Sequence, residues 1–209
     1  MKASNKGQVI EGYFKRGSDY VFAVILLFIF FPFFIIIPLL LKFICRDSPL
    51  FVQKRLGYKG KEFKMYKFKT MKGGAASGEK NLQIAELGQK ARFYDHKVNS
   101  AITPLGRFLR RSSLDELPQL FNVLRGQMSL VGPRPFMPNK ELRQDPLYGI
   151  RSSRLPGITG LPQIKGRGDL TIKEWLLLDA RYVDNWSLFF DFKIILLTVP
   201  VVLSRKGAY

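Results

Sequence analysis

The sequence contains very little cysteine and histidine: its 209 residues include one of each, Cys45 and His96. One cysteine cannot form a disulfide within the chain, and it excludes a zinc site built from several cysteines. No second histidine or cysteine is present to form a ligand cluster with His96, so we expect it to be an ordinary surface histidine.

Acidic residues are also scarce. The chain has 16 aspartates and glutamates against 34 lysines and arginines, a formal net charge of +18. Such an excess implies an anionic partner: a nucleic acid, an acidic membrane surface or a phosphorylated substrate. Hydrophobic residues make up 46% of the sequence, which excludes a disordered chain, and the length suffices for one domain plus an accessory segment.

One long stretch lacks charge altogether. Residues 20–41 form a run of 22 uncharged, mostly apolar residues, which is long enough to cross a bilayer. The run is too long for a signal peptide, and no small-residue cleavage site follows it. Pro32 lies at its midpoint and Pro38 follows, and each removes a helix hydrogen bond, so we expect a kinked membrane helix.

The flanks of this run are basic on both sides, with Lys15 and Arg16 before it and Lys42 and Arg46 after it. Basic flanks are typical of cytoplasmic ends. A re-entrant helix, which enters and leaves on one face of the membrane, gives both flanks a cytoplasmic location. All four basic side chains are then expected to face anionic lipid headgroups. A straight span with a proline bend is the alternative that the pattern leaves open.

Alternating apolar and basic residues predict a β-hairpin over residues 48–71, with its turn at 57–60. Side chains two positions apart share one face of a strand. Lys67 and Lys69 are therefore expected on the same face of the second strand.

The remaining sequence is predicted to alternate short helices with loops. The segment MSLVGPRP predicts a strand that ends at a Gly-Pro turn. Loops are expected at 73–78 and 156–168. Apolar spacing predicts helices at 82–94, 103–111, 117–124 and 171–183, and a membrane-surface helix at 186–203, where charges and a proline interrupt the apolar run.

Two carboxylates, Asp115 and Glu116, stand side by side in the basic stretch RRSSLDELPQLFNVLRGQMSLVGPRP. Ser113 and Glu116 fit a helix capping box, which is one interpretation. Pro118 argues against it, because a proline is better placed as the first helical residue. The carboxylates would then precede the helix, where its positive end holds them ionised and surrounding arginines favour phosphate.

These residue types suit phosphoryl chemistry. A carboxylate can attack phosphorus and form an acyl phosphate. A diphosphate substrate also needs its charge neutralised, by Mg²⁺ on oxygen ligands and by arginine side chains. Both kinds of group are present in this stretch.

Five ordered segments resemble one known family: KRGSD, FVQKRLG, FKMYKFKTM, LRRSSLDELPQLFNVLRGQMSLVGPRP and PGITGLPQIKGRG. The sequence is similar, over residues 15–203, to the bacterial sugar transferases, which are membrane-anchored polyprenyl-phosphate phosphoglycosyl transferases. The resemblance implies that Asp115 is the covalent nucleophile and that Glu116, with Asp115, binds Mg²⁺. It also implies a substrate-binding set of Lys67, Lys69, Arg110, Arg134, Arg154, Gln163 and Arg167.

The chain departs from the family pattern at a few positions. Phe31 stands where many members have a serine before the kink proline. Leu155 occupies the position of a basic residue, which leaves the phosphate role of neighbouring Arg154 open. Gln127 replaces a frequent acid, and Lys165 replaces an asparagine. None of these positions belongs to the carboxylate pair.

The resemblance implies a helix-rich α/β protein of the α+β kind, monotopic in the membrane. Residues 1–47 would hold the re-entrant helix, and residues 48–209 a catalytic domain on the cytoplasmic face of the bacterial inner membrane. The expected reaction transfers a sugar 1-phosphate from a UDP-sugar to a polyprenyl phosphate such as undecaprenyl phosphate. It releases UMP and begins the assembly of a surface glycan.

The expected partners are these two substrates and anionic lipids, not nucleic acid, and a homo-oligomer stays open. Two other functions are compatible with the residues. One is a glycosyl transferase that moves only the sugar and releases UDP. The other is a non-enzymatic basic scaffold, which predicts salt-sensitive binding to any polyanion and no turnover.

Overall fold

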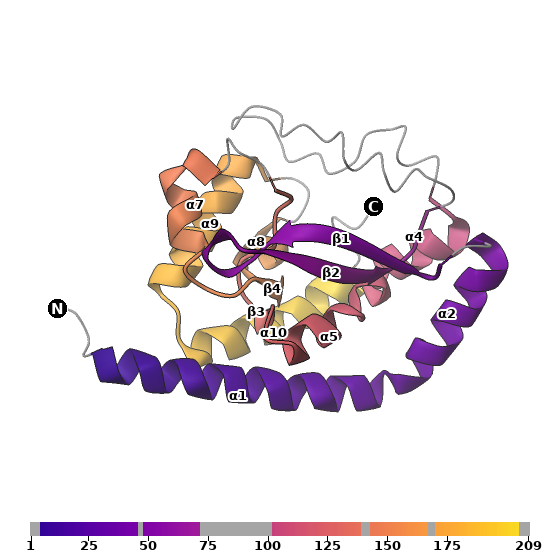
Figure 1. Ribbon diagram of the computed structural model, residues 1–209, viewed down its shortest axis with the longest axis horizontal. Helices are drawn as coiled ribbons and strands as arrows, with labels where there is room; N and C mark the ends of the chain where they lie inside the picture. The colour runs from indigo at the N-terminus through magenta and orange to yellow at the C-terminus, as the bar shows by residue number, and fades with distance from the viewer. Residues whose placement is uncertain (1–4, 46–47, 72–101, 139–142, 167–169, 205–209) are drawn as a thin grey trace.

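The computed structural model, shown in Figure 1, describes residues 5–45, 48–71, 102–138, 143–166 and 170–204. Within these ranges, helices surround two small two-stranded sheets, so the predicted helix-rich α/β class is confirmed. The loop expected at 73–78, the helix expected at 82–94 and His96 lie outside the described residues.

Two helices form the N-terminal segment: α1 (Asn5–Ile29) and α2 (Phe31–Cys45). They meet at a bend of 61°. Among the described helices, no single one is long and apolar enough to cross a membrane, but this bent pair is, by length and composition, when its two arms are taken together. In Figure 1, α1 runs along the lower edge of the protein and α2 rises beside the hairpin.

The bend follows from Pro32. Proline has no N–H to donate to the carbonyl of Phe28, and its ring clashes with that carbonyl in a continuous helix. The chain therefore breaks at Phe30, and the N–H of Phe33 bonds back to the Phe30 carbonyl at 3.0 Å. Pro38 lies inside α2 without ending it. The predicted kink is confirmed, two residues before the proline that causes it.

A β-hairpin of β1 (Leu50–Leu56) and β2 (Glu62–Phe68) confirms the prediction for residues 48–71. A turn of 3₁₀-helix, η1 (Tyr58–Gly60), connects the strands, with positive φ angles of 52° at Lys59 and 71° at Gly60. The strand β2 ends at Phe68, so Lys69 follows the strand instead of extending its face.

A second sheet joins a strand that was predicted, within MSLVGPRP, to a segment that was predicted to be a loop. β3 (Ser129–Val131) pairs in parallel with β4 (Gly157–Thr159), and α8 (Leu161–Lys165) follows. The loop prediction was wrong for most of 156–168, which forms β4 and α8. Its glycines were interpreted as loop residues, but Gly157 allows β4 to pack closely against the β3 segment. A Cβ on Gly157 would lie 2.1 Å from the backbone nitrogen of Gly132, so only glycine lets the strands approach.

Three further helices complete the domain: α7 (Pro146–Arg151), α9 (Ile172–Asp184) and α10 (Leu188–Leu203). The last two confirm the helices predicted at 171–183 and 186–203, while the membrane-surface location of the second stays a prediction. Helix α9 begins with a capping box of Thr171 and Glu174. Along α10, large apolar side chains such as Phe189, Phe192, Leu196, Val199 and Leu203 are exposed.

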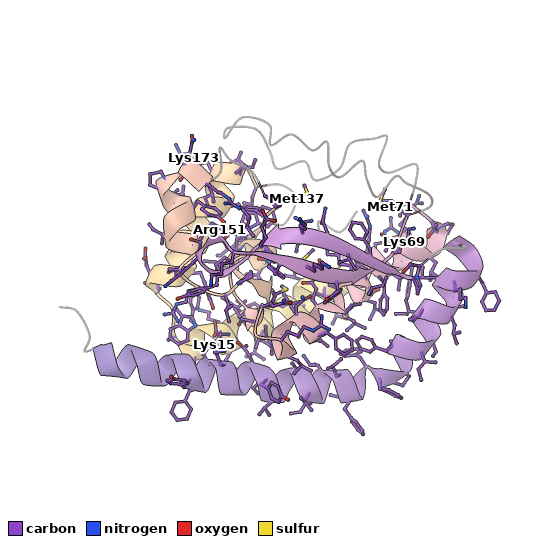
Figure 2. All side chains as sticks on the ribbon, viewed as in Figure 1. Lys15, Lys69, Met71, Met137, Arg151 and Lys173 are labelled. Atoms are coloured by element: carbon purple, nitrogen blue, oxygen red, sulfur yellow. The ribbon has the colours of Figure 1, made fainter. Side chains whose placement is uncertain are left out.

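A buried polar cluster joins α1 to the rest of the domain; we call Lys15, Asp19, Tyr182, Trp186 and Asp191 the Lys15 cluster. Lys15 Nζ lies 2.7 Å from Asp191 Oδ2 and 3.2 Å from Asp19 Oδ1. Tyr182 and Trp186 donate hydrogen bonds to the Asp191 carboxylate at 2.7 and 3.1 Å. Figure 2 shows Lys15 pointing from α1 towards the domain. Its side chain is 13% exposed, which contradicts the expectation that Lys15 faces lipid headgroups.

Candidate active site

The carboxylate pair lies in a sharp connection between two helices, α4 (Pro104–Arg111) and α5 (Gln119–Leu124). Ser113 has a positive φ of 56° and makes no side-chain cap bond, so the capping-box interpretation is wrong. Asp115 and Glu116 lie in one turn of 3₁₀-helix, η3 (Leu114–Glu116). As the position of Pro118 predicts, both carboxylates precede α5, which begins one residue after the proline.

Two cations hold the Glu116 carboxylate. Lys67 Nζ on β2 lies 2.9 Å from Glu116 Oε1, and Arg134 Nη2 lies 3.1 Å from the same oxygen. Burial alone would raise the pKa of Glu116. The charges and hydrogen bonds of Lys67 and Arg134 outweigh that effect and hold the pKa well below its usual value. Glu116 is therefore a carboxylate at any physiological pH.

Asp115 has a different environment although it is the next residue. It is 7% exposed, and no residue in the described ranges donates a hydrogen bond to its carboxylate. Burial is the largest influence on its pKa and raises it, and the charge of Glu116 acts in the same direction. Lys67, Arg110 and Arg134 lower it, and the net result is a pKa of about 6. At Asp115, burial therefore outweighs the favourable field of the helix end, although a carboxyl with a pKa of about 6 is still mainly ionised at neutral pH, as predicted.

Arg110 is fixed near the pair by Thr70. Its Nε donates to Thr70 Oγ1 at 2.8 Å. The two segments approach closely because Gly106 has no side chain: a Cβ there would lie 2.1 Å from the Thr70 carbonyl oxygen. No role was predicted for Thr70, although it directly follows Lys69 at the basic end of the hairpin.

Asn122 brings β2 and α5 together, which sequence reasoning also missed. Its side chain is fully buried; it accepts from Tyr66 N at 3.1 Å and donates to the Lys64 carbonyl at 2.7 Å. These bonds place Lys67, on the same strand, beside the carboxylates. An asparagine inside the otherwise apolar run LFNVL is a signal for such a buried contact, because buried polar side chains need partners.

The structure thus brings together five of the predicted site residues, which we call the dyad site: Lys67, Arg110, Asp115, Glu116 and Arg134. The other four predicted residues behave differently. Lys69 lies at the end of the hairpin near α2 and α4, as Figure 2 shows. Arg167 lies outside the described residues.

The guanidinium of Arg154 lies 3.8 Å from the ring centroid of Trp186, in the Lys15 cluster. It is not among the cations that shift the pKa of Asp115 or Glu116. Gln163 on α8 is 6% exposed, and within the described residues its amide oxygen and nitrogen have no hydrogen-bond partner. Neither side chain contacts the carboxylate pair in the described structure.

The donor set of the dyad site fits a magnesium ion shared with a substrate. Mg²⁺ prefers oxygen ligands and is commonly held by one or two carboxylates, substrate phosphates and water. Asp115 and Glu116 supply two neighbouring carboxylates, and both cations that contact Glu116 do so through Oε1. In the described part of the chain, no group of three or more histidine, cysteine or acidic side chains forms a complete metal cage.

Comparison with known proteins decides the family. The model of the family described as "Bacterial sugar transferase" matches residues 10–205. The chain belongs to the bacterial sugar transferase family. The resemblance drawn from the five sequence segments is therefore confirmed, and the family match covers α1 and α2 as well as the dyad site.

Named relatives support the predicted enzyme class, a phosphoglycosyl transferase. The chain is 39% identical over 204 residues to "Exopolysaccharide production protein ExoY" of Rhizobium meliloti, covering 96% of this chain and 90% of that protein. It is 39% identical to "Undecaprenyl-phosphate galactose phosphotransferase" of Salmonella typhimurium, over 94% of this chain and 42% of that protein. It is also 39% identical to "UDP-glucose:undecaprenyl-phosphate glucose-1-phosphate transferase" of Xanthomonas campestris pv. campestris, over 93% of this chain and 40% of that protein.

Proposed function

We propose that this sugar transferase moves a sugar 1-phosphate from a UDP-sugar to undecaprenyl phosphate and releases UMP. The observation that carries the proposal is the dyad site, where the buried Asp115 and the partly buried Glu116 lie among three cations. This arrangement suits a diphosphate, because the cations stabilise the phosphate charge while one carboxylate attacks. Glucose and galactose, named in two relatives, are the first donors to consider.

Asp115 is the proposed nucleophile. A carboxyl with a pKa near 6 is ionised at neutral pH, and its lack of a hydrogen bond from the described residues leaves its lone pairs for reaction. Its oxygen attacks the phosphorus that bears the sugar, the bond from that phosphorus to the bridging oxygen breaks, and UMP leaves with the electron pair. The lipid phosphate then attacks the same phosphorus and releases the Asp115 carboxylate.

Glu116 would hold Mg²⁺, with Asp115 beside it as a second oxygen donor. When bound, the ion supplies neutralisation of the diphosphate charge. Lys67 and Arg134 orient the Glu116 carboxylate, and Arg110 and Arg134 present guanidinium groups for substrate phosphate.

The acceptor is a lipid, so we propose that α1 and α2 form a re-entrant wedge with both ends on the cytoplasmic face of the inner membrane. Their 61° bend and their exposed apolar side chains, which include Phe22, Phe28, Phe33 and Phe43, support this arrangement. The exposed apolar side chains of α10 would lie at the same surface. The excess of basic residues favours anionic lipids there.

Nucleotide analysis tests the reaction. Purified protein, undecaprenyl phosphate and Mg²⁺ are incubated with UDP-glucose, UDP-galactose and their N-acetylated forms, and the released nucleotide is identified. We expect UMP with one donor and no release from Asp115→Asn. Release of UDP would show transfer of the sugar alone, and no turnover with any donor would favour the basic scaffold.

Cysteine labelling tests the wedge. In a Cys45→Ser background, Asn5→Cys and Lys61→Cys should be shielded equally from an impermeant thiol reagent in intact cells. Lysed cells provide the control that both sites can react. Labelling of the Asn5→Cys site alone in intact cells would show a straight span.

A further inference from the structure

The backbone around Arg134 is fixed by hydrogen bonds to its carbonyl groups. The four consecutive carbonyl groups of residues 133–136 each accept a hydrogen bond, and the donors come from three elements: β1, β4 and α7. Two donors are backbone N–H groups of β4 and β1, at 2.9 and 2.8 Å, and a third is Arg55 Nη1 at 3.4 Å. The fourth donor is Arg151 Nη2, which binds the carbonyl of Arg134 itself.

Arg151 is immobilised from several sides. Its Nε and Nη2 both lie 2.8 Å from Asp179 Oδ2 on α9. Its guanidinium carbon lies 4.1 Å from the ring centroid of Phe136. The side chains of Arg151 and Asp179 are 4% and 1% exposed. Figure 2 shows Arg151 on the α7 side of the molecule, away from the hairpin end that carries Lys69.

Stability alone does not account for this ion pair. Burying two charges costs desolvation energy, and replacing a buried ion pair with apolar side chains is often neutral or stabilising. Such a pair is better explained by the geometry it imposes. Here the ion pair constrains the backbone at Arg134. The backbone torsion angles there are already restricted by Pro133 and Pro135 on its two sides.

We propose that Arg151 and Asp179 are positioning residues for Arg134. Asp179 orients the Arg151 guanidinium, Arg151 fixes the Arg134 carbonyl, and the Arg134 side chain is thereby aimed at Glu116 Oε1, 3.1 Å away. The inference rests on the proposed function, in which Arg134 contacts substrate phosphate. Neither residue touches the reacting atoms.

The test compares Arg151→Lys and Asp179→Asn with a control on the same helix, Leu176→Ala. Arg151→Lys keeps the charge but loses the planar fork, and Asp179→Asn removes the charge that orients it. Leu176 is fully buried three residues before Asp179, in the apolar cluster that contains Phe136. Its truncation therefore loosens the packing around Arg151 but removes neither charge of the ion pair. Thermal midpoints of all variants are measured first, so that activity can be compared at matched stability.

Initial rates of nucleotide release should fall about 10- to 100-fold in Arg151→Lys and Asp179→Asn, the range expected when a positioning partner is lost. The Leu176→Ala rate per folded molecule should stay near that of the unchanged protein. In an Arg134→Lys background, Arg151→Lys should add little further loss, because its effect passes through Arg134. Equal fold losses in both backgrounds would overturn the proposal.

A crystal structure of Asp179→Asn provides a readout without turnover. The contact between Arg134 Nη2 and Glu116 Oε1 should be lost, and its retention would contradict the proposal. If both charge variants fail to fold, Phe136→Leu replaces them in the rate measurement and in the crystal structure. This variant keeps both charges and removes only the ring face beside Arg151. The identity of the nucleotide released by the unchanged protein tests the proposed function separately, since the crystallographic result does not depend on the substrate.

Discussion

Two buried charged regions of this protein look alike in composition but differ in how their charges are satisfied. In the Lys15 cluster, one lysine faces two aspartates, and neutral donors complete them: Leu130 N binds Asp19 at 3.2 Å, and Tyr182 and Trp186 bind Asp191. In the dyad site, three cations face two carboxylates, and no described residue donates a hydrogen bond to Asp115.

The difference separates a structural cluster from a reactive one. In the Lys15 cluster, both carboxylates accept hydrogen bonds from neutral donors and lie beside the Lys15 ammonium, which fixes α1 against β3 and α10. In the dyad site, Lys67 and Arg134 hold Glu116, while burial leaves Asp115 with a raised pKa. Perturbed carboxyl groups of this kind are typical of catalytic sites. Substitutions should therefore affect chemistry in one region and stability in the other.

The largest effect is expected from Asp115→Asn. An amide cannot act as the attacking carboxylate, so turnover should fall by at least about 10,000-fold, as for other catalytic nucleophiles. The thermal midpoint should hold or rise, because a buried group with an unfavourable charge is removed. Steady-state nucleotide release and thermal unfolding check both parts. A fully active variant would exclude the aspartyl mechanism.

Glu116→Gln should rank next. The substitution removes the charge that Lys67 and Arg134 neutralise and the proposed ligand of Mg²⁺. We expect a loss of about 100- to 1,000-fold, comparable to the loss of one strong electrostatic stabiliser, and a shift of the Mg²⁺ dependence to higher concentration. A magnesium titration of the rate measures it, and an unchanged Mg²⁺ dependence would argue against Glu116 as a ligand.

Arg134→Lys should cost about 10- to 100-fold in rate. The charge is kept, but lysine cannot offer two parallel donors to a phosphate. A matched control is Arg107→Lys, an exposed arginine on α4, which should leave the rate near its original value. Full activity in Arg134→Lys would mean that Arg134 acts through its charge alone.

In the Lys15 cluster, Asp191→Asn should act mainly on stability. It leaves Lys15 with one carboxylate and weakens the acceptor of Tyr182 and Trp186, so we expect a loss of about 2 kcal/mol in unfolding free energy. Denaturant unfolding and the rate per folded molecule separate the two effects. A rate loss as large as that of Glu116→Gln, at unchanged stability, would contradict the comparison.

The smallest effect is expected from Arg154→Ala. Its guanidinium stacks on Trp186, so the substitution should lower stability by about 1 kcal/mol through the lost cation–π contact. The rate of nucleotide release should stay near that of the unchanged protein. A large rise in KM for the UDP-sugar would instead support the phosphate role that the family resemblance implied for this position.

The sequence predicted the elements whose signals are local. The hairpin, α9, the kink and the separation of the carboxylates from α5 followed from alternation, apolar spacing and prolines. The close approach of Gly132 and Gly157 was missed, because a glycine looks the same in a turn and in a tight strand pair. Lys15 was expected at the membrane, because its partner Asp191 is remote in sequence.

For the candidate site, the charged residues were predicted from the sequence, but the contacts that hold them in place were not. Family resemblance indicated Asp115, Glu116, Lys67, Arg110 and Arg134, and the structure brings these five together. The supporting contacts of Asn122, Thr70, Arg151 and Asp179 were not predicted, since each joins segments that are distant along the chain. The raised pKa of Asp115 also depends on burial, which arises only when those segments pack.

The central claim, that Asp115 becomes covalently bonded to the sugar phosphate, is tested most directly by a single-turnover experiment without acceptor. The protein is mixed with its UDP-sugar and Mg²⁺ but no polyprenyl phosphate, and released nucleotide and protein mass are followed together. We expect a burst of UMP that approaches one per active site, with a matching mass increase by one sugar phosphate, and neither in Asp115→Asn. No burst and no mass increase, with UMP appearing only after polyprenyl phosphate is added, would contradict the claim.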